Sequence, residues 1–190
     1  MITESGRLRS KSTSRTEGAR LAPLHDCSSG HISGKGWLPI DPQGTRNGTD
    51  IYRKLAKGEE VTLPHWGMET LAHVHADDVA QMFVKSVANP GAAIGESFST
   101  VAASAMSLKG CCEVVARLFG REPNLKFVSF EAFEAEIGEV SGTTKSHMEH
   151  SLCSRLEKAQ RLLGYAPRYT TQDIFAETIE FLLDSGELKV

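Results

Sequence analysis

The 190-residue chain lacks the features that mark membrane proteins and nucleic-acid binders. No apolar run approaches the ~20 residues that a transmembrane helix requires. Basic residues are not in excess, because 21 Lys and Arg stand against 24 Asp and Glu and the formal net charge is −3. A basic surface for nucleic acid or anionic lipid is therefore not expected. We predict no nucleic-acid and no membrane partner, and a small molecule or another protein as the ligand.

Cysteine is sparse, and its spacing does not match metal-binding or redox motifs. None of the four cysteines forms a Cys-x-x-Cys pair; they are Cys27, Cys111, Cys112 and Cys153. The adjacent Cys111 and Cys112 fall in a helical pattern, in which neighbouring side chains diverge. We therefore expect buried, reduced thiols and a cytoplasmic protein.

Signatures of nucleotide binding and of ester hydrolysis are also missing. No Gly-x-Gly-x-x-Gly stretch joins a strand to a helix, and no Gly-x-Ser-x-Gly elbow occurs. The segment Gly34-Lys-Gly36 invites a phosphate-loop interpretation, but the spacing fails. Gly30 is one residue too close to Gly34, and Gly36 occupies the position of the required hydroxyl. A plain loop is the favoured interpretation.

Composition divides the chain into a tail and one folded portion. Residues 1–28 lack apolar periodicity and are rich in Ser, Thr and Arg, so we expect a disordered tail. Residues 29–190 are long enough to bury one moderate core. Their apolar spacing predicts helices over 77–89, 107–119, 155–163 and 171–184, short helices near 51–57 and 130–137, and strands near 60–63, 73–75, 96–101 and 125–129. We predict an α/β fold with mixed strand pairing.

Three helix starts carry capping signals. Asp77 or Asp78 is expected to cap the helix that follows the strand His73–His75, because a carboxylate accepts the free N–H groups of a first turn. Ser154-Arg-Leu-Glu157 and Thr170-Thr-Gln-Asp173 have the spacing of capping boxes. Each box is predicted to open one of the last two helices.

His73 and His75 alternate on a strand and so share one face, as two metal ligands would. Asp77 or Asp78 is a candidate third ligand, yet an Asp at a helix start already has a capping role. The sequence indicates no fourth ligand. We therefore favour a packed or substrate-facing His pair and predict no metal site.

Three segments together resemble the C-terminal half of the extended short-chain dehydrogenase/reductases, the NAD-dependent epimerase/dehydratase family. They are Gly30-His-Ile-Ser-Gly-Lys-Gly36, the segment from Gly58 to Ala80 that ends in His73-Val-His-Ala-Asp-Asp-Val-Ala80, and Glu157-Lys-Ala-Gln-Arg-Leu-Leu-Gly-Tyr-Ala-Pro-Arg-Tyr169. The resemblance implies a partial Rossmann-like fold. It would be the substrate-binding portion, with short strands and several helices, and the N-terminal dinucleotide-binding half would be missing.

The resemblance also implies site residues. Gly30, His31 and Ile32 would contact the nicotinamide end of NAD or NADP. The substrate pocket would be lined by Trp37, His65, Trp66 and His73, although the two Trp side chains suit a core edge equally well. Sugar-nucleotide members often carry an Arg where this chain has Leu71. An uncharged or non-nucleotide substrate is therefore expected.

The family's acid/base pair, a Tyr with a Lys four residues later, is not found. Tyr52, Tyr165 and Tyr169 are followed at that distance by Ala56, Tyr169 and Asp173. No catalytic residue is therefore assigned, and whether the chain is an enzyme stays open. One hypothesis is the substrate-binding portion of an oxidoreductase or isomerase that acts on a small hydroxy or keto compound, inactive alone and not binding NAD(P) alone. The other is a non-enzymatic module or truncated paralogue that pairs with a full-length enzyme or with itself.

Overall fold

The structure, a computed structural model, describes residues 26–45, 48–138, 145–146, 148 and 150–190. The expected tail therefore lies largely outside the described residues, and so does most of the stretch 139–150, for which the sequence predicts no element. The first described element is the strand β1 (Asp26–Ser29). The boundary that we expected after residue 28 falls inside this strand.

The helices agree with the apolar spacing. The four longer predictions are confirmed to within two residues, as α2 (Ala76–Ala88), α4 (Leu108–Leu118), α7 (Glu157–Leu163) and α8 (Thr171–Asp184). The two short helices are also present, as α1 (Asp50–Lys57) and α5 (Phe130–Ile137). A further one-turn helix, α3 (Pro90–Ala93), follows α2 directly.

The described strands are short and form four pairs. Three pairs are parallel: β1 with β6 (Ser97–Thr100), β2 (His31–Ser33) with β5 (His73–His75), and β3 (Glu60–Pro64) with β8 (Asn124–Val128). The fourth, β4 (Thr70–Leu71) with β7 (Met106–Ser107), is antiparallel. The predicted α/β class with mixed pairing is confirmed.

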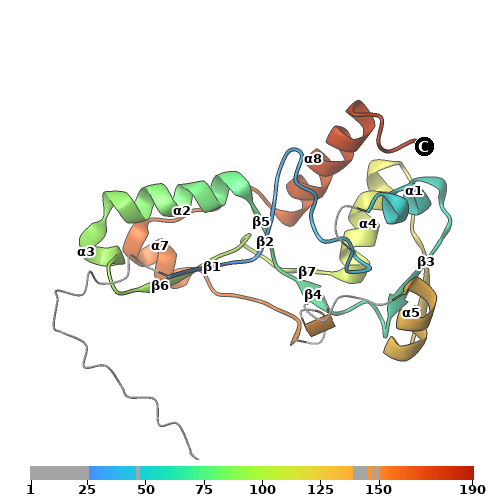
Figure 1. The fold of residues 1–190 in the computed structure, drawn as a ribbon, viewed down its shortest axis with the longest axis horizontal. Helices are drawn as coiled ribbons and strands as arrows, with labels where there is room; N and C mark the ends of the chain where they lie inside the picture. Colours follow the sequence, from blue (N-terminus) through green and yellow to red (C-terminus); the bar gives the residue numbers. More distant parts are fainter. Residues whose placement is uncertain (1–25, 46–47, 139–144, 147, 149) are drawn as a thin grey trace, which may run out of the picture.

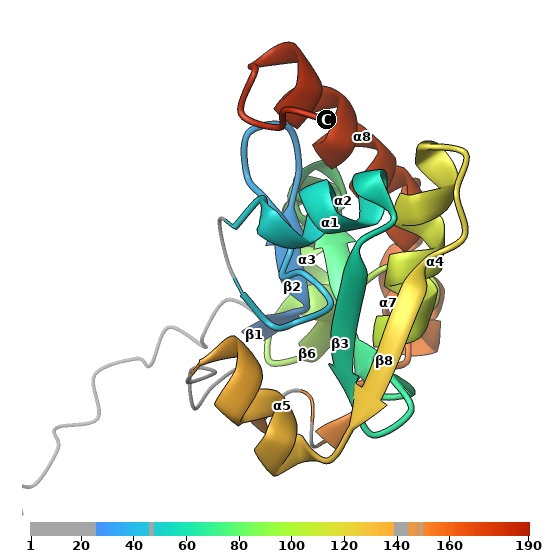
Figure 2. The same ribbon diagram turned by 90° about the vertical axis from the view of Figure 1, so that its right-hand side faces the viewer.

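The described residues form two hydrophobic cores, and the elements that contribute to them lie largely at opposite ends of the molecule (Figure 1). The larger contains residues of α1, α4 and α8 packed against β3, and Figure 2 shows β3 beside β8 with α5 at their end. The smaller contains residues of α2, α3, α7 and β6. The pair β2–β5 lies between them, so it connects the two cores.

The chain changes strand partner at Gly30. Its N–H donates to the Thr100 carbonyl that ends β6, at 3.0 Å, and the next N–H, of His31, donates to Ala72, just before β5, at 2.8 Å. A Cβ on Gly30 would lie 2.6 Å from the Ala72 carbonyl oxygen. Real Cβ atoms do not approach an oxygen that closely, so this crossover requires glycine.

The expected carboxylate cap of α2 is wrong, because His75 holds the capping position. Its backbone is extended, and its Nδ1 accepts the N–H of Asp77 at 3.2 Å. The helix thus begins at Ala76, which places both Asp residues inside its first turn. Asp78 is fully buried and instead accepts the N–H groups of Arg168 and Tyr169, at 3.0 and 3.1 Å.

One predicted capping box is confirmed and the other is wrong. At α8, Thr170 Oγ1 accepts the N–H of Asp173 at 3.2 Å, and Asp173 accepts the N–H of Thr170 at 2.7 Å. At α7, the capping position is Leu156, without a side-chain hydrogen bond. Leu156 is buried in the smaller core, and the helix begins only after it, three residues beyond Ser154.

Candidate functional site

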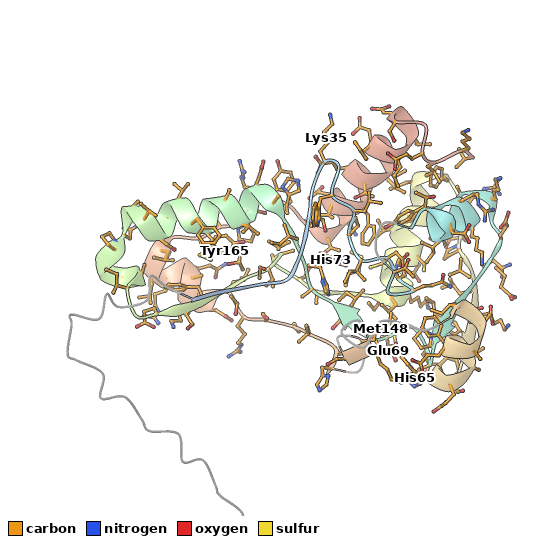
Figure 3. The ribbon with its side chains drawn as sticks, viewed as in Figure 1. Lys35, His65, Glu69, His73, Met148 and Tyr165 are labelled. Atoms are coloured by element: carbon orange, nitrogen blue, oxygen red, sulfur yellow. The ribbon has the colours of Figure 1, made fainter. Side chains whose placement is uncertain are left out.

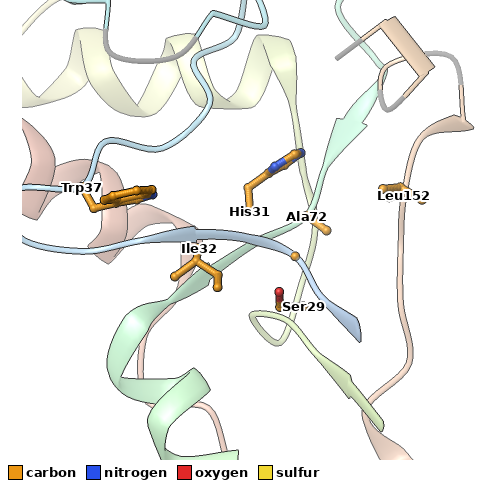
Figure 4. A pocket seen from close by; sticks show the side chains of 7 residues that line it. Ser29, His31, Ile32, Trp37, Ala72 and Leu152 are labelled. Atoms are coloured by element: carbon orange, nitrogen blue, oxygen red, sulfur yellow. The ribbon is translucent and has the colours of Figure 1, made fainter. Parts of the chain in front are cut away.

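A cavity of about 350 Å³ opens at the Gly30 crossover (Figure 4). Its walls come from the crossover itself, the following turn, the end of β4 and a distant loop; they are Ser29, Gly30, His31, Ile32, Trp37, Ala72 and Leu152. Ligands of open α/β sheets bind beyond the carboxyl ends of the strands, where strand neighbours change. The cavity has that position relative to β1 and β6.

Trp37 is held at the cavity by a tight turn. The N–H of Trp37 donates to the Gly34 carbonyl at 2.8 Å, and the Gly34 N–H donates back at 3.1 Å. Gly36 has a φ of +79°, which glycine adopts without strain. Gly34-Lys-Gly36 is thus part of this turn. The turn leaves the Trp37 side chain 64% exposed, so its ring can contact a ligand.

The described lining of the cavity is mostly apolar and contains no Lys or Arg. Ile32 and Trp37 are exposed, whereas His31 is buried and lies 5.9 Å, between ring centroids, from His73. A pocket of this kind suits an uncharged ligand with an apolar face, because an anion would find no Lys or Arg among its described walls.

His73 does not reach this cavity, contrary to the expected substrate-binding role. Its strand β5 packs against α8, so the side chain enters the larger core and is fully buried. Nε2 bonds to the Ile40 carbonyl at 3.0 Å, and the ring meets Phe175 edge-on at 5.4 Å. Burial disfavours the charged imidazolium and lowers the pKa of His73 to about 4.

His65 and Trp66 lie elsewhere, because β3 pairs with β8 and carries the turn after Pro64 toward α5. His65 lines a different cavity with Phe130, and Trp66 is 73% exposed with its ring 5.9 Å from Phe127. Gly30, His31, Ile32 and Trp37 therefore line one cavity. His73 lies beside His31 on the paired strand but does not line the cavity, and His65 and Trp66 lie elsewhere.

The two strand histidines are both engaged by protein groups. His75 bonds through Nε2 to Glu177 Oε2 at 2.8 Å, and its ring stacks on Tyr169 at 3.8 Å. His73 bonds to Ile40, as described above. Within the described ranges, no three His, Cys, Asp or Glu residues are grouped as metal ligands.

The structure describes the side chains of three of the four cysteines, in two environments, and the prediction for Cys27 lies outside them. Cys111 and Cys112 are buried in the larger core, where burial raises the pKa of both thiols. Cys153 is exposed, so the expectation that it is buried is wrong; it lies on the irregular segment before α7. In the described part of the chain, no helix is long and apolar enough to cross a membrane.

Sequence reasoning missed Ser29, Ala72 and Leu152 as lining residues. Leu152 lies far from the crossover along the chain, and no local pattern signals that it returns there. Ala72 contributes through the backbone that meets Gly30. Only a known strand order could have identified either residue.

Comparison with known proteins identifies the fold. No protein-family model and no curated protein matches the chain. Solved structures do match. The epimerase Mth375 of Methanothermobacter thermautotrophicus has 14% identity and a TM-score of 0.60, and the match covers 85% of this chain and 43% of that one. The UDP-glucose 4-epimerase of Thermotoga maritima has 18% identity and a TM-score of 0.57, and the match covers 85% of this chain and 46% of that one. The UDP-glucuronic acid 4-epimerase of Bacillus cereus, solved with UDP-glucuronic acid and NAD, matches with 14% identity and a TM-score of 0.59 over 84% and 45%.

These matches confirm the resemblance at the level of the fold. The chain spans less than half the length of the solved structures that it matches. It has the partial Rossmann-like α/β arrangement found in part of the NAD-dependent UDP-sugar epimerases.

The buried His73 predicts a pH dependence of stability. As the pH falls, the unfolded chain protonates His73 near 6.5, but the folded protein does so only near 4. The free energy of unfolding therefore decreases from pH 6.5 toward pH 4, and His73 contributes about 2 kcal/mol of the loss between pH 7 and pH 5. Urea unfolding of the wild type and of His73→Gln at the two pH values measures this contribution.

His150→Gln is the control for that measurement, because His150 is exposed. It should keep the wild-type pH dependence, while His73→Gln should flatten it. Equal pH dependence in the wild type and in His73→Gln would contradict a neutral, buried His73.

Proposed function

We propose that the chain is the substrate-binding portion of an NAD(P)-dependent oxidoreductase or isomerase of the epimerase/dehydratase type, acting on a small hydroxy or keto compound. The observation that carries this proposal is the cavity at the Gly30 crossover, placed where open α/β sheets bind ligands. Gly30, His31 and Ile32 would contact the nicotinamide end of NAD or NADP. Trp37 would contact the substrate.

An uncharged substrate fits the cavity better than a sugar nucleotide. The Thermotoga maritima structure contains UDP-glucose, whose diphosphate needs cationic side chains or helix N-termini around it. No Lys or Arg is among the lining residues that the structure describes. Leu71 is 1% exposed in the larger core, so this position offers no charge either.

The chemistry itself would need a complementary dinucleotide-binding domain. Hydride transfer requires a bound nicotinamide and a group that moves a proton. The sequence contains neither a Gly-x-Gly-x-x-Gly loop nor a Tyr with a Lys four residues later. We therefore propose that these 190 residues bind neither NAD nor NADP by themselves and have no activity alone.

Two features of the described residues suit such a domain. In the described part of the chain, β1 pairs only with β6, which leaves its other edge available for a further strand. Helix α2 exposes Phe83, Val84 and Val87, and the last two are 68% and 76% exposed. An open strand edge and exposed apolar side chains are features that a partner surface covers.

The same two features support the second candidate function, a non-enzymatic module that pairs with a full-length enzyme or with a second copy of this chain. In that case the Trp37 cavity would have no catalytic use. The two candidates differ in whether cofactor chemistry appears once a complementary domain is present.

The first test is titration calorimetry of the 190-residue chain with NAD and with NADP. We expect no saturable heat at millimolar cofactor, because no fingerprint loop holds the pyrophosphate. Micromolar binding of either cofactor would contradict the proposal that a second domain is required.

The second test is size-exclusion chromatography of the chain alone. We expect self-association through α2, and we expect the double variant Val84→Glu/Val87→Glu to shift the protein toward the monomer, because charges on an apolar contact oppose burial. Leu118→Glu, on the exposed side of α4, is the matched control and should behave as the wild type. A monomeric wild type would show that the α2 surface needs no partner.

A further inference from the structure

A second cavity, of about 360 Å³, lies near α5 and shares no lining residue with the cavity at Gly30. Its walls are His65, Met68, Glu69, Phe130, Met148 and Ser151. Figure 3 shows three of these side chains, His65, Glu69 and Met148, gathered at the same end of the molecule. The function proposed above makes no use of them.

The backbone is strained at two points on the wall of this cavity. His65 and Ser151 have φ values of +48° and +46°, and no other non-glycine residue in the described ranges has a positive φ. Such conformations persist where the surroundings enforce them. Here the N–H of His65 donates to Val128 at 2.7 Å, and Ser151 Oγ accepts the N–H of Thr70 at 3.4 Å.

The two carboxylate oxygens of Glu69, in the wall of the cavity, differ in their hydrogen bonding. Glu69 is only 13% exposed, and its Oε1 is paired with Nδ1 of His65. Its Oε2 is buried and has no hydrogen-bond partner among the described residues. When His65 is neutral and Nδ1 donates to Glu69, Nε2 is an acceptor. The cavity therefore offers two acceptors that call for donors from a ligand.

The remaining walls are apolar. Phe130 lies 6.1 Å from the His65 ring, between centroids, and Met148 is buried beside them. Met68 is 66% exposed and can cover a ligand. Lys145 lies over the Phe130 ring at 4.8 Å, but its ammonium is bound to Glu134 at 3.1 Å. No Lys or Arg is among the described residues that line the cavity, so an anion is disfavoured beside Glu69.

We propose that this cavity is a second ligand site, which binds a neutral polyhydroxylated ring such as a pyranose. Hydroxyl groups donate to Glu69 Oε2 and to His65 Nε2, and the apolar ring face packs on Phe130 and Met68. The size of the cavity lies within the range of small-molecule sites. The proposal is independent of the function proposed for the Gly30 cavity.

Saturation-transfer NMR on the 190-residue chain tests the proposal with D-glucose, D-galactose, D-mannose and N-acetyl-D-glucosamine. At least one of these sugars should bind, and Glu69→Gln, which replaces the acceptor by an amide, should weaken that binding about tenfold or more. Glucose 1-phosphate, an anion, and choline, a cation, are comparison probes that should bind more weakly. Trp37→Ala, in the other cavity, should leave sugar binding unchanged.

His65→Gly separates binding from folding. Glycine relieves the positive φ, so the variant should melt at the wild-type temperature or above it while sugar binding is lost. The proposal is overturned if no sugar binds, if Glu69→Gln binds sugar as well as the wild type, or if choline or glucose 1-phosphate binds more tightly than every sugar. Loss of sugar binding in Trp37→Ala would equally overturn it, since the ligand would then occupy the other cavity.

Discussion

The close approach of Gly30 to the Ala72 carbonyl is the contact on which the arrangement depends. Consecutive N–H groups, of Gly30 and His31, donate to the last residue of β6 and to Ala72, which directly precedes β5. One chain therefore joins the sheet of the smaller core to β5, which packs against the larger one. The same step leaves a cavity between the crossover and Trp37. The connection between the cores and the candidate site thus share one structural cause.

The start of α2 reinforces that connection. His75 caps the helix and bonds to Glu177 on α8, so the last residue of β5 is tied to the larger core. Three residues later, Asp78 holds the backbone of Arg168 and Tyr169, the segment that leads from α7 into α8. A buried carboxylate is tolerated here because backbone N–H groups satisfy it. The C-terminal helices are therefore positioned by the residues that follow β5.

Sequence patterns predicted the helices well and the site only in part. Helices depend on local apolar spacing, so α8 and its Thr170–Asp173 capping box could be predicted from the sequence. Strand pairing is not local: β3 pairs with β8 across a long stretch of chain, which separates His65 from Trp37. The prediction of an Asp cap was wrong because His75 occupies the capping position of α2. No sequence pattern indicates that Ser151 and His65 line the same cavity.

The most direct test of this account is the stability of Gly30→Ala compared with Gly91→Ala. A Cβ at residue 30 meets a backbone oxygen at 2.6 Å, whereas one at residue 91, in α3, meets nothing within 4 Å. Urea unfolding should show a loss of about 2 kcal/mol or more for Gly30→Ala, and no loss or a small gain for Gly91→Ala. Equal stability of the two variants would contradict a crossover that only glycine permits.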